Sequence, residues 1–463
     1  MSAKEAPFRM ESDLLGSTAV PIEAFHGAQT QRALENFPTG NRRTIGDYPD
    51  LIRGMMVVKL AAAKVNCAGG FLSGRVADAI VASAEEVLRE ELYDRFPIHF
   101  LHGGGGTSAN MNANEVLANM AEERLGGRRG EYQLVHPNDH VNLHQSTNDV
   151  YPTACHIAII LKWKELRGAL ERLAEAFSVR ARELASQSRI ARTCLQDAVP
   201  IGFGNFLGGY ASLLKRSLRR LQRLVEDLYS VNMGGTIVGR KKDVPPSYLS
   251  AIVPAIAEEL GDTGFRQAED LYDAAQNPDP IAAVASMLSI LARGLVKIGK
   301  DFRLMGSGPE CGFGEILMPP VQPGSSIMPG KVNPVIAEFL IQTAFQAMGH
   351  GAACQVAVDH GELDLNVWES IMIANVLDAM SELGDGIRAF EFKCVSGFTV
   401  VVDRNTENAG TIAPMLVELM HKCGYSAASA VCREAGGDRE KLGRMLREVG
   451  PLPQVPDLEE DEK

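Results

Sequence analysis

The stretch GSSIMPGKVNP, Gly324 to Pro334, separates two long segments of helical pattern. Its glycines favour a turn with exposed backbone amides, and Ser325 and Ser326 lie on that turn. Lys331 follows on the same loop, and its neighbours predict a buried lysine. A serine beside amide donors and a positive charge ionises more easily, because both stabilise the alkoxide. No Gly-x-Ser-x-Gly elbow and no His–Asp pattern accompanies it. The loop therefore predicts a serine base rather than an acyl-transfer nucleophile.

Long helical patterns lie on both sides of this loop. Apolar residues recur at three- and four-residue spacing, with charged residues between them. The expected helices cover residues 50–66, 155–189, 206–232, 280–305, 335–358 and 366–394. Most are far longer than the average helix of about 11–12 residues, which is typical of bundles and of oligomer interfaces. No alternating pattern predicts a large sheet, so the predicted fold class is mainly α.

Composition limits the classes of function. The chain has 463 residues, 45% hydrophobic and 22% charged, with a net charge of -12. This charge argues against general binding to nucleic acid or anionic membranes, although a local pocket can still hold an anion. The eight cysteines form no Cys-x-x-Cys pair, which fits reduced thiols in the cytoplasm. No signal peptide and no run of 18 apolar residues is found, so a cytoplasmic location is expected.

Two other polar stretches interrupt the apolar patterns with hydroxyls and amides. GGGGTSANMNANEV, residues 103–116, offers Thr107, and a helix is expected to start near Asn112 and to favour an anion. Taken alone, this stretch is better explained as an ordinary glycine turn with a helix cap. Residues 136–153 place Ser146, Thr147 and Asn148 before a long helix, where neutral donors suit a carboxylate. Ordinary helix capping is the alternative.

Two further patterns carry weaker signals. His136, His140 and His144 are spaced four apart, but no acidic motif accompanies them, so no metal is expected. The stretch RTCLQDAVPIGFGNF, residues 192–206, reads as a kink between two helices rather than as a site.

Taken together, these stretches resemble the signatures of the aspartase/fumarase superfamily. GSSIMPGKVNP matches one signature without a gap, and the other motifs follow in the same order over residues of about 10–445. The residues at 106–119, 136–154, 53–63 and 268–279 look closer to those of aspartate ammonia-lyases, whereas the GAQTQ motif near Gly27 looks fumarase-like. The resemblance implies a three-domain fold, a homotetramer with a twenty-helix core, and active sites that each draw loops from three subunits.

The helical patterns divide the chain into regions, and the resemblance implies a reaction. The expected regions are a mixed, mostly helical N-terminal domain at 1–145, a central bundle at 146–395, a small helical domain at 396–450, and an acidic, disordered tail at 451–463. The implied reaction is the reversible anti β-elimination of ammonia from L-aspartate, or from a closely related β-carboxylated amino acid, to give fumarate through an aci-carboxylate; the substrate is thus a small dicarboxylate. It requires no cofactor.

Residue roles are implied in the same way. Ser325 matches the base on a mobile loop, Lys331 and Asn333 match contacts to the α-carboxylate, and Glu338 matches an acidic residue behind them. The remaining matches form the rest of the expected site: Thr107, Ser146 and Thr147 around the β-carboxylate, Asn148 near the leaving amine, Thr193 as a carboxylate contact, and Ser326 as an added donor.

Several positions depart from the family pattern. Cys194 stands near the leaving group, where histidine or glutamine is usual. The other departures are Asn205 and Phe206 in GNFLGG, Arg240, Lys241 and Lys242 in GRKKDV, and Glu310 in SGPECG. Three interpretations of these departures stay open. The protein is an aspartate ammonia-lyase that tolerates the substitutions, an enzyme that eliminates a different amine or substituent, or a fumarate hydratase. A non-catalytic scaffold, as in lens crystallins of this superfamily, is disfavoured by the intact Ser325 and Lys331.

Overall fold

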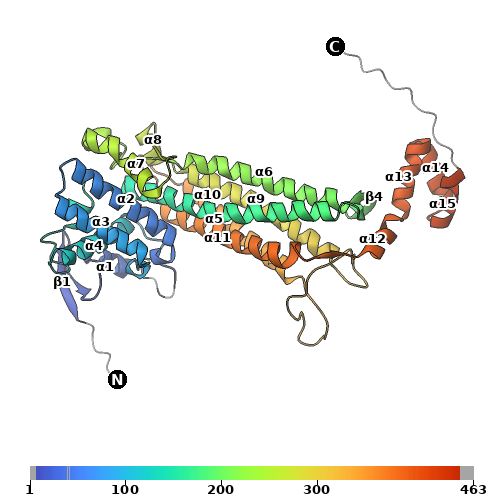
Figure 1. The fold of residues 1–463 in the computed structure, drawn as a ribbon, viewed down its shortest axis with the longest axis horizontal. Helices are drawn as coiled ribbons and strands as arrows, with labels where there is room; N and C mark the ends of the chain where they lie inside the picture. The colour runs from blue at the N-terminus through green and yellow to red at the C-terminus, as the bar shows by residue number, and fades with distance from the viewer. Residues whose placement is uncertain (1–6, 39, 41, 449–463) are drawn as a thin grey trace, which may run out of the picture. The chain divides into compact units, whose positions relative to one another are not determined.

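The computed structural model describes residues 7–38, 40 and 42–448, and it is mainly helical, as predicted (Figure 1). Strands occur in the described residues only as four two-stranded sheets. The pairs are β1 (Phe8–Asp13) with β2 (Gly16–Pro21), β3 (Ser188–Thr193) with β4 (Gln196–Gly202), β5 (Ser230–Val231) with β6 (Arg266–Gln267), and β7 (Ile316–Leu317) with β8 (Thr399–Val400). Only the β5–β6 pair is parallel.

The chain forms two compact units. Unit 1 comprises residues 1–170, 216–295 and 342–385, and unit 2 comprises 171–215, 296–341 and 386–463. The domain bounds expected from the sequence, near residues 145 and 395, stay predictions. The acidic tail at 451–463 lies outside the described residues.

Five long helices cross from one unit to the other. They are α5 (Thr147–Glu183), α6 (Phe203–Asp227), α9 (Asp279–Met305), α10 (Val335–Val358) and α11 (Glu369–Phe390). Within unit 1, side-chain hydrogen bonds fix their neighbours: Trp163 of α5 to Gln222 of α6 (3.0 Å), Gln355 of α10 to Ser286 of α9 (2.7 Å), and His350 of α10 to Asn375 of α11 (2.6 Å). The expected bundle pattern is therefore present, although α5 begins at Thr147 instead of residue 155.

Helix α9 is, within the described residues, a long and strongly apolar helix. By length and composition it could cross a membrane, with a mean hydropathy of 1.8 over its most apolar window. However, 67% of that window is buried inside the structure, as in a helix that forms part of a protein core.

The rest of unit 1 includes α1 (Ala28–Asn36), α2 (Pro49–Ala68), α3 (Gly74–Arg89), α4 (Thr107–Arg124), α7 (Pro246–Leu260) and α8 (Leu271–Gln276). Of these, α3, α4 and α7 pack against α2, and α1 packs against α4. Helix α2 begins with a proline, which suits the first helical position, and is buried along most of its length. Gly54 lets α2 approach α5 closely, because a Cβ there would lie 2.5 Å from the carbonyl oxygen of Ala154.

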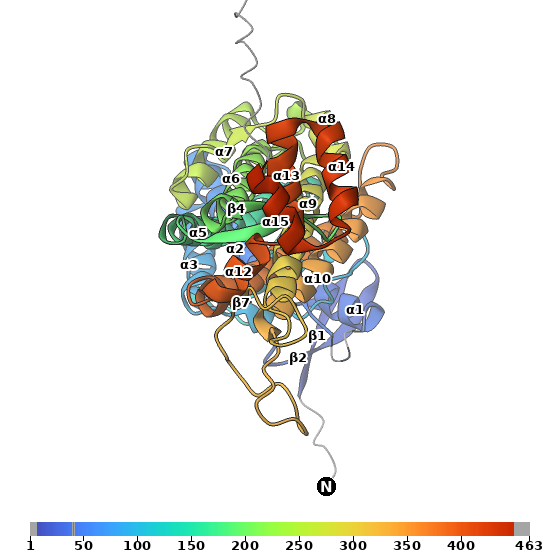
Figure 2. The same cartoon turned by 90° about the vertical axis from the view of Figure 1, so that its right-hand side faces the viewer.

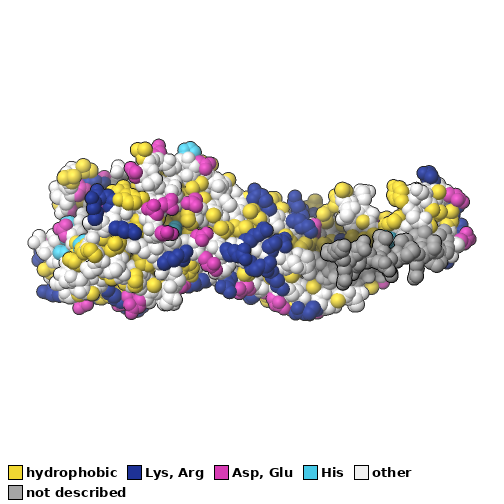
Figure 3. Space-filling model, turned by 90° about the horizontal axis from the view of Figure 1, so that it is seen from above, with side chains coloured by type: hydrophobic (Ala, Val, Ile, Leu, Met, Phe, Trp, Pro, Cys, Tyr) yellow, Lys and Arg dark blue, Asp and Glu magenta, His cyan; other side chains and the backbone are white. Residues whose placement is uncertain are grey.

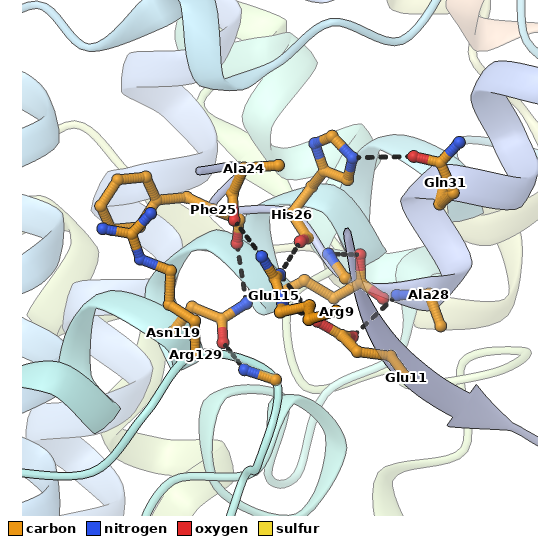
Figure 4. Close-up of polar contacts among 12 residues, drawn as sticks. Arg9, Glu11, Ala24, Phe25, His26, Ala28, Gln31, Glu115, Asn119 and Arg129 are labelled. Carbon is orange, nitrogen blue, oxygen red and sulfur yellow. Dashed lines mark hydrogen bonds and ion pairs between the residues drawn. The ribbon is translucent and has the colours of Figure 1, made fainter. Parts of the chain in front are cut away.

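Buried carboxylates hold the start of α1 against α4 (Figure 4). Glu115 of α4 accepts hydrogen bonds from the backbone amides of Gly27 (2.8 Å), Gln29 (2.8 Å) and Thr30 (3.1 Å). Glu11 of β1 accepts from the amide of Ala28 at 3.0 Å. Burial raises the pKa of Glu115, and the amide donors oppose that shift. The GAQT stretch therefore works as a helix start fixed by a carboxylate.

Unit 2 includes four short C-terminal helices. They are α12 (Val402–Ala409), α13 (Ile412–Cys423), α14 (Tyr425–Ala435) and α15 (Arg439–Glu448). Figure 2 shows the last three packed together, around a small core of Leu419, Ala428, Ala435 and Leu442.

Positive charge gathers over α6 in spite of the negative net charge (Figure 3). Its exposed arginines are Arg216, Arg219, Arg220 and Arg223. Their local field attracts anions to this face of the helix.

A pH effect on stability is expected from Glu369, the buried first residue of α11. Burial raises its pKa to about 8. In the unfolded chain it ionises near the ordinary value, so its contribution to stability is full below about pH 4.5 and is lost as the pH rises through about 8. At pH 8.5, Glu369→Gln is therefore expected to increase the free energy of unfolding by on the order of 2–4 kcal/mol, which is measured as a higher thermal midpoint. At pH 4.5, the same substitution is expected to change the free energy of unfolding little. Equal changes at both pH values would contradict this account.

Candidate active site

Ser146, Thr147 and Asn148 form the N-terminal end of α5, in unit 1. Ser146 precedes the helix, and its hydroxyl accepts a hydrogen bond from the amide of Asn148 at 3.3 Å. Asp149 accepts in return from the amide of Ser146 at 2.9 Å, which completes a reciprocal cap. All three predicted residues are half-buried, so their polar groups remain accessible at a helix N-terminus that favours an anion.

Asp149 ties this helix start to a second loop. Its other carboxylate oxygen accepts from the amides of Gly234 (3.1 Å) and Thr236 (3.0 Å). Asp149 is buried, which raises its pKa to about 6, whereas the amide donors and Lys59 act in the opposite direction. Asn148 contacts the same loop, since its Nδ2 donates to the carbonyl oxygen of Ile237 at 2.8 Å.

Thr107 begins α4, which corrects the expectation of a helix start near Asn112. Gly106 precedes it with φ of 88°, a left-handed conformation that favours glycine. The sequence signal was misread because the helix starts after this glycine, without a Ser, Asp or Asn cap. Thr107 itself is exposed, and its hydroxyl donates to the carbonyl oxygen of Gly104 at 2.8 Å.

The earlier start of α4 brings the first two polar stretches together. Asn110, one turn after Thr107, donates through Nδ2 to the hydroxyl of Thr147 at 3.1 Å. The same Nδ2 donates to Oδ1 of Asn142 at 3.2 Å. The structure therefore joins the starts of α4 and α5 in one polar cluster within unit 1.

A buried lysine, which the sequence reasoning missed, lies against this cluster. Lys59 of α2 is fully buried and donates to Oδ1 of Asn142 (2.8 Å) and to Oε1 of Gln145 (3.0 Å). Burial lowers its pKa to about 7, and the charge of Asp149 opposes that shift. The only sequence signal was one lysine inside the apolar run MMVVKLAAA, because its partners lie more than 80 residues further along the chain.

Gly106 provides a test of how strongly this geometry is fixed. A Cβ at Gly106 would lie 2.4 Å from the ring of Tyr151, so Gly106→Ala is expected to displace the start of α4. We expect a loss of at least about 2 kcal/mol in unfolding free energy, measured by chemical denaturation. Gly104→Ala is the matched control, because φ is 83° there but the nearest atom would lie 3.8 Å away. Equal losses in both variants would show that backbone strain alone matters.

Thr193 and Cys194 lie on a β-hairpin in unit 2, not on a kink between helices. Thr193 pairs with Gln196 across the two-residue turn Cys194–Leu195, and both turn residues have positive φ, 52° and 61°. Such a turn normally carries Asn-Gly or Asp-Gly, so Cys-Leu at this position does not indicate a hairpin. Thr193 and Cys194 are both exposed at the tip.

A buried carboxylate anchors this hairpin. Glu315 is fully buried and pairs with Arg192 (2.5 Å) and Arg189 (3.3 Å) of β3. The carbonyl oxygen of Glu315 accepts from Asn405 of α12 at 2.8 Å. The end of the hairpin opposite its tip is therefore fixed by ion pairs and a hydrogen bond.

The loop from Gly324 to Asn333 is closed at its neck and carries Ser325. The amide of Gly324 donates to the carbonyl oxygen of Lys331 at 2.8 Å, and Nδ2 of Asn333 donates to the carbonyl oxygen of Gly324 at 2.8 Å. The hydroxyl oxygen of Ser325 accepts from the amides of Ile327 (3.2 Å) and Met328 (2.9 Å). These donors stabilise a negative charge on that oxygen, as a serine base requires.

The surroundings of the loop correct one expectation. Lys331 is exposed rather than buried, and so is Ser326. Two hollows adjoin the loop, of about 440 Å³ beside Ser325 and about 1000 Å³ beside Lys331 and Asn333. Glu338 lines the larger hollow and pairs with Arg303 at 3.3 Å. Apolar side chains at the tip are also exposed, 84% for Ile327, which suits a loop that closes onto another surface.

The departures from the family pattern fall in both units. Phe206 lies against the guanidinium of Arg189, 4.3 Å from the ring centroid, and Asn205 is exposed one residue before it. Glu310 lines the larger hollow beside the loop. In unit 1, Arg240, Lys241 and Lys242 line a separate hollow with Glu269 and Asp270.

No group of three or more potential metal ligands occurs in the part of the chain that the structure describes.

The predicted residues thus form two sets, each inside one unit. Thr107, Ser146, Thr147 and Asn148 belong to unit 1, and the rest belong to unit 2: Thr193, Cys194, Ser325, Ser326, Lys331, Asn333 and Glu338. The first set offers neutral donors at helix starts, and the second offers a hydroxyl held by amides together with an exposed ammonium.

Comparisons with known proteins identify the family of this chain. A lyase family model matches residues 16–349. The chain is 38% identical over 444 residues to an aspartate ammonia-lyase of Bacillus sp, covering 96% of this chain and 94% of the relative. It is also 38% identical over 452 residues to a class II fumarate hydratase of Methylorubrum extorquens, covering 97% and 94%.

A solved structure extends this likeness to three dimensions. The fumarate lyase:delta crystallin of Brucella melitensis, bound to cobalt, superimposes with a TM-score of 0.89 at 37% identity, covering 96% of this chain and 99% of that one. The chain is a lyase by family. It belongs to the aspartase/fumarase superfamily.

Proposed function

We propose that this protein catalyses the reversible anti β-elimination of ammonia from L-aspartate, which gives fumarate. The observation that carries the proposal is the Ser325 hydroxyl, which accepts two backbone amides on a closed loop that also bears Lys331 and Asn333. The likeness to aspartate ammonia-lyases at 38–41% identity supports ammonia as the leaving group.

The residue types fit the steps of such a reaction. Ser325 takes a proton from Cβ, and the electron pair moves into the adjacent carboxylate, which becomes an aci-carboxylate with two negative charges. Thr107, Ser146 and Thr147 offer neutral donors to that carboxylate, each worth about 2.7–4 kcal/mol in the transition state. Lys331 and Asn333 hold the α-carboxylate. The electron pair then returns, the Cα–N bond breaks, and the amine leaves near Asn148.

We also propose a cytoplasmic homotetramer with shared active sites. Donors and base lie in two different units of one chain, and family resemblance implies that loops from several subunits meet. Apolar side chains exposed on the long helices fit burial between subunits, including Ile290 of α9 and Phe345 of α10, each 51% exposed. Light scattering that gives a monomer at micromolar concentration would contradict the tetramer.

Cys194 motivates a second candidate substrate. It is exposed at a hairpin tip where imidazole or an amide is usual in the family, and a thiol is a weaker hydrogen-bond donor. A bulkier amine or another Cα substituent would fit the smaller side chain. The class II fumarate hydratase relative keeps L-malate as a further candidate.

One assay separates these candidates. Fumarate absorbance is followed with L-aspartate and, in parallel, with L-malate, and a panel of β-carboxylated amino acids is followed by mass spectrometry. The proposal expects fumarate from L-aspartate with an efficiency at least about tenfold above that with L-malate. Turnover of L-malate alone would favour the hydratase, and turnover of only a panel member would favour a different amine.

A further inference from the structure

The amides around Lys59 form a continuous chain from α2 to the start of α5. Nζ of Lys59 donates to Oδ1 of Asn142 (2.8 Å), and Nδ2 of Asn110 donates both to this Oδ1 (3.2 Å) and to Oγ1 of Thr147 (3.1 Å). Each link lies inside unit 1. The chain therefore connects a buried ammonium to a hydroxyl at an accessible helix start.

The direction of each hydrogen bond follows from the chemistry of the ends. An ammonium can only donate, so Asn142 and Gln145 must face it with oxygen. The amide nitrogens of these two side chains donate to backbone carbonyls, Asn142 to Gln145 O (3.1 Å) and Gln145 to Val141 O (2.9 Å). Both residues are thus fixed at two ends, and the turn at 142–145 is tethered to α2.

The same logic reaches Thr147. Because Oδ1 of Asn142 is an acceptor, Asn110 must face it with Nδ2, and the same NH2 group then donates to Thr147. Oδ1 of Asn110 is buried without a hydrogen-bond partner, which is the cost of this orientation. Thr147 accepts from Asn110, so its own hydrogen is free to point toward a substrate oxygen.

We infer that Lys59 is a positioning residue: through Asn142 and Asn110 it holds the Thr147 hydroxyl as a donor for the substrate carboxylate. This inference rests on the proposed function of the same site. A purely structural lysine would need a partner for its charge but would not need a chain of oriented amides that ends at the predicted carboxylate cradle.

The test is a double-mutant cycle in kcat and KM. Lys59→Met keeps the length of the side chain and removes the charge, and Thr147→Val removes the hydroxyl. Each single variant is expected to lower kcat, Lys59→Met about 10–100-fold and Thr147→Val about 100-fold, with KM changed by less than about threefold. The double variant is expected to match Thr147→Val alone, because the lysine acts through that hydroxyl. Losses that multiply would overturn the inference.

Two controls separate positioning from general destabilisation. Lys64→Met removes an exposed lysine of the same helix, paired with Glu259, and is expected to leave kcat unchanged. Asn110→Asp keeps Lys59 but replaces the donor to Thr147 by an acceptor, so it is expected to reproduce the loss in kcat even if Lys59→Met fails to fold. Full activity of Asn110→Asp would also overturn the inference.

A crystal structure of Lys59→Met tests the chain independently of turnover. The expected result is a displaced turn at 142–145 and loss of the hydrogen bond from Asn110 to Thr147. An unchanged turn with both Asn110 contacts in place would contradict the inference. Absence of turnover in the unmodified protein would instead contradict the proposed function.

Discussion

Ser325→Ala is expected to lower kcat by about 10³–10⁴-fold. The hydroxyl of Ser325 is the only group on its loop whose oxygen is held by two backbone amides, at 2.9 and 3.2 Å, among the residues that the structure describes. These donors stabilise its ionised form, and general-base catalysis contributes about 10²–10⁴-fold. Alanine removes the base, and the hydrogen bonds that close the neck of the loop do not involve the Ser325 side chain. Steady-state kinetics with fumarate absorbance measures the loss.

The neighbouring serine is the matched control for this variant. Ser326 is exposed, and Ser326→Ala is expected to cost at most about tenfold, as for a single added donor. Gel filtration should show the same assembly for both variants and for the unmodified protein. Near-normal turnover in Ser325→Ala would remove this serine as the base.

Lys331→Met is expected to lower kcat/KM by about 10²–10³-fold, largely through KM. Lys331 is exposed on the closed loop and lines the hollow of about 1000 Å³ with Asn333, so its ammonium is available to a carboxylate. Removing the ammonium from a charge-assisted hydrogen bond to the bound substrate costs several kcal/mol. Because the α-carboxylate keeps its charge throughout the reaction, ground state and transition state lose this contact alike.

Lys393→Met is the control for charge in the same hollow. Lys393 also lines it and is exposed, but it lies on a different segment and has no role in the proposed chemistry. Its kcat/KM should stay within about twofold of the unmodified protein. Similar losses of kcat/KM in both variants would mean that the total positive charge of the hollow determines kcat/KM, and that Lys331 makes no specific contact with the substrate.

The long helices could be read from the sequence because one signal dominates them. Residues 335–358 repeat an apolar spacing over many turns, and α10 has these same bounds. The start of α4 was harder, since glycines with positive φ replaced the usual capping residues before Thr107. The hairpin that bears Cys194 was missed for a related reason, because Cys-Leu occupies a turn that normally requires Asn-Gly.

The candidate site could be predicted only in part. The sequence motifs indicated Ser325, Lys331 and residues 146–148 as site residues, since their side chains can perform the chemistry. The motifs could not show that Lys331 is exposed or that Lys59 is buried, because burial depends on segments far away in sequence. Asn110 illustrates the same limit: its partners Asn142 and Thr147 are brought to it by the packing of α4 against the start of α5.

Removal of ammonia from L-aspartate, with Ser325 as the base, can be tested directly. The most direct measurement incubates L-aspartate with the unmodified protein and with Ser325→Ala, side by side, and quantifies fumarate and ammonium. The expected result is equal molar release of both products by the unmodified protein and a rate at least about 10³-fold lower for the variant. Fumarate formed at equal rates by both proteins, or no fumarate from either at high concentration, would contradict the claim.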